Sequence, residues 1–152
     1  MKLRYSVLSI LIACLLFNIG CSSAKEEKQG SSLMNIPWKL TDYIILPNAT
    51  WGKSDANKLI FKEATISENS ISFNNQNCKE VIFKRSPVSL GKYLSQKYHI
   101  SIDAMKLKEQ AVTQITTNCH LNGFSNYLQL ADRRIIIFIN GVAFFLVPAI
   151  NY

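Results

Sequence analysis

The chain of 152 residues has few of the side chains from which catalytic and metal sites are built. Its two histidines, His99 and His120, each stand alone, without a carboxylate or cysteine at a metal-ligand spacing. The ten acidic residues are scattered, and no pair has a spacing that favours general acid–base catalysis. There is also no Gly-rich nucleotide loop. We therefore expect a protein that is not an enzyme and that uses no metal or cofactor.

The first 21 residues carry the marks of an export signal. Lys2 and Arg4 form a short basic start, and an apolar run over 7–17 is broken only by Ser9. Small and apolar residues then lead to Cys21. The apolar run is too short to predict a membrane-spanning helix. The segment therefore predicts export from the cytoplasm.

This segment resembles the signal of bacterial lipoproteins, in which the cysteine after the cut is lipidated and becomes the mature N-terminus. Asn18 stands three residues before Cys21, where that family usually has Leu. The resemblance implies a signal peptide over 1–20 and a membrane anchor on Cys21, with palmitate among its acyl chains. By the same resemblance, Ser22 instead of Asp implies sorting to the outer membrane, on its periplasmic face.

Cysteine is also scarce, and its positions fit an oxidising compartment. Of four cysteines, Cys14 is lost with the signal and Cys21 carries the lipid, which leaves Cys78 and Cys119. Two remaining cysteines in such a compartment most simply form a disulfide, although two unrelated buried thiols are the alternative. Closing a loop of about forty residues would stabilise the fold by roughly 4 kcal/mol.

Acidic residues are outnumbered by basic ones, ten against seventeen. Without Lys2 and Arg4 of the signal, fifteen basic residues remain, a formal net charge of about +5. This charge favours anionic neighbours such as phospholipid or lipopolysaccharide head groups, cell-wall carboxylates or an acidic protein. Nucleic acid fits the charge alone, but an exported and tethered chain would rarely meet it, so we expect no nucleic-acid partner.

The mature chain is expected to be a tether followed by one domain. Residues 22–32 are small, charged or amide-bearing, and predict a lipidated flexible tether over 21–35 with a reach of roughly 20 Å. An apolar content of 48% favours a globular body, which we place over 36–152.

Within that body, short alternating segments predict strands, and one segment predicts a helix. Apolar residues at three- and four-residue spacing predict a helix over 87–98, with Ser86 as its N-cap and Pro87 at its first position. Residues 103–110 fit either a short helix or an irregular crossing. Strands are expected at 38–46, 59–66, 70–74, 80–84, 112–119 and 124–130.

The clearest hairpin closes the chain. Asn140-Gly141 separates two apolar segments, 134–139 and 142–147, and both turn residues tolerate positive φ. Both faces of the hairpin are apolar, so we expect it to be central, with one face in the core and the other under the helix. The fold predicted is α+β and mostly β, a small antiparallel barrel or strongly curved sheet with one covering helix.

The densest basic clusters are Lys84-Arg85 and the pair Arg133-Arg134. Such clusters are typical of solvated strand ends and turns, or they belong to a face that meets an anionic partner. Trp51 is either a wedge under its loop or a ligand platform. Together these five residues are the candidate partner-binding residues.

The size, late disulfide and strand-rich ending give the body a loose resemblance to small β-barrel envelope lipoproteins, including those that inhibit lysozyme. This implies an envelope-anchored module that binds or inhibits a protein. Because a strongly basic lysozyme would be repelled, immunity against an acidic toxin fits better. The alternatives are a structural envelope protein, or a lipocalin-like carrier whose cavity is lined by Phe61, Phe73, Phe83 and the last hairpin.

Overall fold

The first described strand, β1 (Ile36–Ile45), pairs antiparallel with the last, β9 (Val142–Pro148). The computed structural model describes residues 36–149. The predicted signal peptide (1–20), lipidated Cys21 and tether (21–35) lie outside the described residues. The other strands are β2 (Glu63–Ile66), β3 (Ser70–Phe73), β4 (Gln76–Lys79), β5 (Phe83–Ser89), β6 (Ala111–Thr117), β7 (Asn126–Gln129) and β8 (Ile135–Ile139), and the helices are α2 (Lys53–Asn57), α3 (Leu90–Tyr98) and the 3-10 turn η2 (Asp103–Met105).

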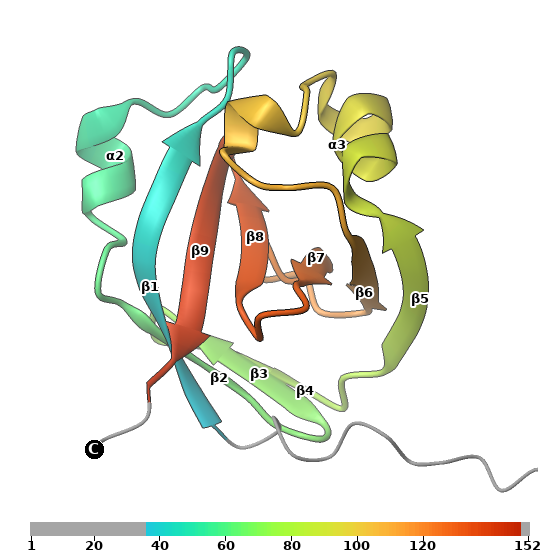
Figure 1. The fold of residues 1–152 in the computed structure, drawn as a ribbon. Helices are drawn as coiled ribbons and strands as arrows, with labels where there is room; N and C mark the ends of the chain where they lie inside the picture. The colour runs from blue at the N-terminus through green and yellow to red at the C-terminus, as the bar shows by residue number, and fades with distance from the viewer. Residues whose placement is uncertain (1–35, 150–152) are drawn as a thin grey trace, which may run out of the picture. The chain divides into compact units, whose positions relative to one another are not determined.

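All nine strands form one antiparallel sheet in the order β4-β3-β2-β1-β9-β8-β7-β6-β5. The sheet curls into a half-barrel, and Figure 1 shows β2, β3 and β4 crossing beneath β1 and β9. β1 and β9 pair in the middle of the sheet. The two free edges are β4 and β5, which are consecutive in the chain. The strongly curved, mostly β fold with one covering helix is therefore confirmed.

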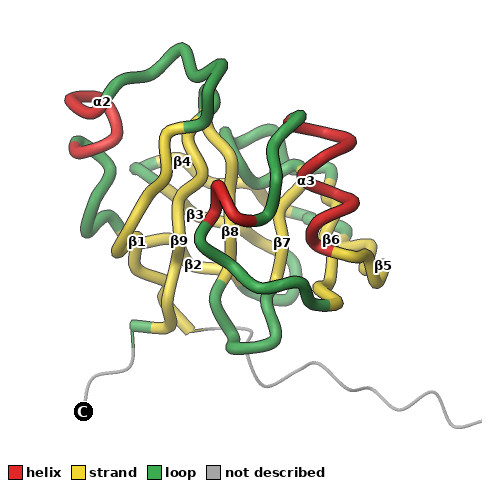
Figure 2. The backbone as a smooth tube through the Cα atoms, turned by 45° about the horizontal axis from the view of Figure 1, so that its top comes forward, coloured by secondary structure: helices red, strands yellow, loops and turns green. Residues whose placement is uncertain are grey.

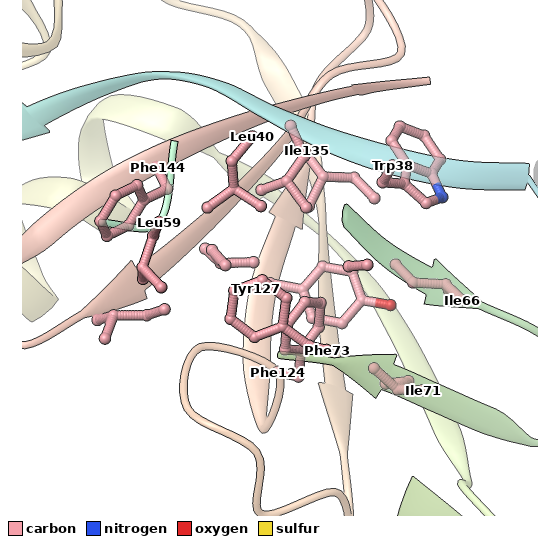
Figure 3. Close-up of a cluster of buried hydrophobic side chains, with 14 of the residues drawn as sticks. Trp38, Leu40, Leu59, Ile66, Ile71, Phe73, Phe124, Tyr127, Ile135 and Phe144 are labelled. Carbon is pink, nitrogen blue, oxygen red and sulfur yellow. The ribbon is translucent and has the colours of Figure 1, made fainter. Parts of the chain in front are cut away.

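Large apolar side chains fill the concave side of the half-barrel. Figure 3 shows side chains of β1, β2 and β3 pointing toward those of β7, β8 and β9. Four of the aromatic side chains there are at most 1% exposed: Trp38, Phe124, Tyr127 and Phe144. Because strand side chains alternate between faces, each strand contributes every second residue to this concave core.

The last hairpin is buried on both faces, as its sequence predicts. Ile137 of β8 belongs to the concave core, whereas its neighbour Ile136 packs with Leu94 of α3 on the convex face. The ring of Tyr98 stacks on that of Phe138, with centroids 4.1 Å apart. Figure 2 shows β1, β9, β8 and β7 side by side, with α3 beside β6. The turn is at Asn140-Gly141, with φ of 49° and 80°.

An irregularity in β1 keeps a charge out of the core. Leu40 pairs with Leu146 and Asp42 with Phe145, so Thr41 is an extra residue in the β1–β9 ladder. Such a bulge reverses which face each later side chain meets. Tyr43 therefore packs against the concave core, and Asp42 is exposed on the other face.

The helix begins three residues later than predicted. Its N-cap is Ser89, whose hydroxyl accepts from the Lys92 N–H at 3.2 Å, and Pro87 lies within β5. The prediction of a helical start at Pro87 was wrong, because a proline is also tolerated in an edge strand.

Other boundaries also differ from the sequence prediction. The strand expected over 59–66 begins only at Glu63, and the loop before it contains the short helix α2. The strand expected over 80–84 is replaced by β5, which begins at Phe83 and continues to Ser89. Asn74 and Asn75, at φ of 49° and 63°, make a tight turn into β4, a strand that was not predicted. The segment 103–110 holds η2 followed by irregular chain.

Candidate functional site: the open seam of the half-barrel

The free edges of the sheet meet at one seam, which we define as β4, β5 and the linking residues 80–82. No ladder joins β4 to β5, although only three residues separate them in the chain. The seam is therefore the place where the described sheet presents unpaired strand edges.

Two devices hold the seam in place. The predicted disulfide is present, joining Cys78 of β4 to Cys119 just after β6, with the Cα atoms 5.7 Å apart. Beside it, the Asn118 side chain accepts from the Ile82 N–H at 2.8 Å and donates to the Glu80 carbonyl at 3.2 Å. The disulfide thus joins β4 to the segment after β6, and the two hydrogen bonds hold the linking residues against the same segment.

The outer edge of β5 carries backbone groups that no other strand uses. Leu90 donates its N–H to the Gln110 carbonyl at 3.0 Å, which continues the β5–β6 ladder. In an antiparallel ladder the N–H groups alternate in direction, so those of Phe83 and Arg85 point away from β6. Pro87, next on that side, has no N–H and ends the usable edge. About four residues of β5 are left to accept another strand.

The side chains around this edge are basic, with one apolar residue among them. Ile82 is 63% exposed, and Lys79 and Lys84 are exposed beside it. Arg85, also exposed, lies opposite Ile115 on the next strand, so it faces the concave side, whereas Lys84 faces the convex side. The described residues hold no acidic side chain in an ion pair with any of these three cations.

Arg85 also reaches the rim of the core. Its guanidinium carbon lies 5.8 Å from the centre of the Phe83 ring. Burial raises the pKa of the Tyr127 hydroxyl, and the positive charge of Arg85 opposes that rise. The arginine is therefore positioned between the apolar interior and the open edge.

The five candidate partner-binding residues do not form one surface. Lys84 and Arg85 are on the seam, three strands away from β8. Trp51 packs against the concave core, with its N–H donated to the Asn140 carbonyl at the far end of β8. It therefore occupies the wedge position under its loop.

Arg133 and Arg134 lie in the turn before β8, a full strand length from Trp51. The Arg134 guanidinium is bound to the Asp132 carboxylate, with contacts of 2.7 and 2.8 Å. This hydrogen bonding lowers the pKa of Asp132 below its ordinary value. The ion pair between Arg134 and Asp132 lies within the turn, so the positive charge of Arg134 is already partly neutralised.

Sequence reasoning missed Lys79 and Ile82 as members of the seam. Nothing in their local pattern marks them, because Ile82 lies within the predicted strand 80–84 and one exposed isoleucine fits an ordinary strand face. Only the pairing order makes β4 and β5 edges and brings these residues beside Lys84 and Arg85.

Metal and membrane features were also sought among residues 36–149. His99 and His120 are both exposed, and this range holds no group of three or more His, Cys, Asp or Glu side chains placed to bind a metal. Within the same range, no helix has the length and apolar character needed to cross a membrane. Comparison with protein-family models, with curated proteins and with solved structures finds no match.

Proposed function

We propose that this is a lipid-anchored envelope protein that binds an acidic protein partner through the seam, as an immunity-like or inhibitor module. The observation that carries the proposal is that, among residues 36–149, β5 has a free strand edge flanked by three cations without ion pairs and by exposed Ile82. The N-terminal segment, with its resemblance to lipoprotein signals, supports the anchor at Cys21.

The chemistry of the edge supports an extended peptide segment as the group that docks. A strand that adds to a sheet edge gains main-chain hydrogen bonds, and its side chains provide specificity. Acidic side chains on that segment would meet Lys79, Lys84 and Arg85, which favours fast association and selects against basic partners. Residues 83–86 are the expected docking positions, since Pro87 ends the edge.

A carrier of small apolar ligands is a weaker proposal. Its cavity would need the concave side, where Trp38, Phe124, Tyr127 and Phe144 pack together. Phe61, expected in its lining, is instead 68% exposed. Filled interiors of small barrels leave the outer surface and edges as the sites of interaction.

The seam is tested by charge reversal with a matched control. The triple variant Lys79→Glu, Lys84→Glu, Arg85→Glu is compared with Lys53→Glu, Lys92→Glu, Lys106→Glu, which changes the charge equally at exposed positions elsewhere. Mature protein is cross-linked in native envelopes at low and high salt. We expect one stoichiometric protein partner, lost at high salt and in the seam variant but kept in the control. Equal loss in both variants, or no protein partner, would contradict the proposal.

The anchor has a separate test. Intact mass of the protein from its native host should match a chain that begins at Cys21 and carries acyl groups. The Cys21→Ser variant should lose the acyl mass and leave the membrane fraction. An unmodified chain beginning at Met1 would refute the anchor without bearing on the seam.

A further inference from the structure

The convex side of β2, β3 and β4 holds a cleft of about 410 Å³, whose lining includes residues of β4 but neither Ile82 nor the seam cations. Four consecutive amide side chains, at 74–77, are part of its lining. The other lining residues are Lys62, Glu63, Thr65, Ser72 and Phe73. A volume of this size accommodates a small organic ligand.

Most of the lining side chains can form hydrogen bonds and are exposed to solvent. Thr65 lies opposite Ser72, which lies opposite Asn77, so the three form a row across the strands. The Ser72 hydroxyl donates to the side-chain amide oxygen Oδ1 of Asn77 at 3.1 Å, which leaves the side-chain NH₂ of Asn77 free to donate. Among residues 36–149, neither Lys62 nor Glu63 makes an ion pair. The cleft therefore presents both donors and acceptors, with its two charges balanced.

An exposed aromatic residue stands beside this cleft. Phe61 is 68% exposed, and the Lys39 ammonium lies 5.3 Å from the centre of its ring. Lys39 pairs with Glu63 of the cleft lining, so the ring lies on the same face. Phe61 also has φ of 67°, an unfavourable conformation for a bulky side chain. The Phe61 N–H donates to the Leu40 carbonyl at 2.8 Å, so a backbone turn against β1 holds this conformation and keeps the exposed ring in place.

We propose that this cleft binds a pyranose oligosaccharide. Amide and hydroxyl side chains can each donate to and accept from sugar hydroxyls, and the C–H face of a pyranose ring suits the electron-rich face of Phe61. The lining is part polar and part apolar, and it holds Lys62 beside Glu63, which suits a ligand that combines hydroxyl groups with a C–H face. Cell-wall glycan and lipopolysaccharide sugars share this chemistry.

The test uses the mature chain in detergent, titrated with two probes and followed by NMR of the side-chain amides. Tetra-N-acetylchitotetraose represents the cell wall, and deacylated lipopolysaccharide core oligosaccharide represents the outer membrane. We expect one probe to shift the amides of 74–77 saturably, with a Kd of about 1 mM or below. If neither sugar shifts these amides, the proposal is overturned.

Variants separate binding from folding. Phe61→Gly removes the ring and accepts positive φ, so it should weaken binding at least about tenfold without lowering the Tm. Asn77→Ala should weaken it as well. Ile82→Ala, which truncates a similarly exposed apolar residue on the seam, should bind the sugar as the wild type does. Wild-type sugar affinity in Phe61→Gly would refute the site. Because Ile82 and the seam cations are not in the cleft, failure of the partner proposal leaves this result unaffected.

Discussion

At the scale of single residues, two chain segments approach closely at the turn between β8 and β9. Gly141 has φ of 80°, and a Cβ added there would meet the backbone of Ala49. Leu46 donates its N–H to the Gly141 carbonyl at 3.0 Å, so the loop after β1 is fixed against the hairpin. Glycine is needed here both for the conformation and for the close approach of two chain segments.

We expect Gly141→Ala to lower the free energy of unfolding by at least about 2 kcal/mol, from left-handed strain and from the clash with Ala49. Gly52→Ala is the control for steric clash, because its new Cβ would meet nothing within 4 Å; as Gly52 is the N-cap of the short helix α2, the change should cost no more than about 1 kcal/mol. Urea denaturation followed by tryptophan fluorescence measures both. A Gly141→Ala variant as stable as the control would show that the loop moves away freely.

At the scale of elements, α3 is short, and its stability depends on caps and packing. The Glu109 carboxylate accepts from the Gly91 N–H at 3.0 Å and from the Ser89 hydroxyl at 3.1 Å. An acidic group at a helix N-terminus is favourable because free N–H groups and the helix dipole meet it there. Leu94, which is fully buried, then packs the helix on the convex face of β8 and β9.

Leu94→Ala should destabilise the protein by about 3 kcal/mol, because it removes a fully buried side chain and leaves a cavity between helix and sheet. Gln96→Ala, on the exposed face of the same helix, should change stability by less than about 0.5 kcal/mol. Thermal unfolding followed by circular dichroism compares the two. Similar melting temperatures for both variants would mean that α3 contributes little to the fold.

At the scale of the whole molecule, the disulfide and the chain itself hold the two edges of the half-barrel near each other. The chain leaves β4 at one edge of the sheet and enters β5 at the other, and the disulfide joins the first edge to the end of β6, the strand next to β5. The seam can therefore stay unpaired without the two edges separating. This is the physical basis for the proposal that a partner binds there.

Replacing both Cys78 and Cys119 by Ser should lower the free energy of unfolding by about 4 kcal/mol, since the bridge closes a separation of 41 residues. Guanidinium unfolding with and without a reductant provides the check. The wild type should lose this increment under reduction, and the double variant should not respond. Equal stability of the two proteins without reductant would contradict a structural role for the bridge.

The candidate site could be predicted from the sequence less completely than the fold could. Lys84 and Arg85 could be picked from the sequence as a basic cluster, and both lie on the seam. Trp51 and Arg134 were candidate partner-binding residues alongside them, but the strand order places both away from the seam. Phe61 was expected to line the cavity of a carrier, and its exposure follows from a left-handed turn that its local sequence does not predict.

The sequence by itself determined the strand-rich class, the last hairpin and its burial on both faces, and the pairing of the two late cysteines. These follow from local rules: alternation with period two, a turn at Asn140-Gly141, and the count of cysteines. Tertiary structure alone decided that Pro87 lies in a strand, that Thr41 is a bulge, and that β4 and β5 are free edges. Those features depend on which strands become neighbours, and that choice is made by side chains far apart in the chain packing into one concave core.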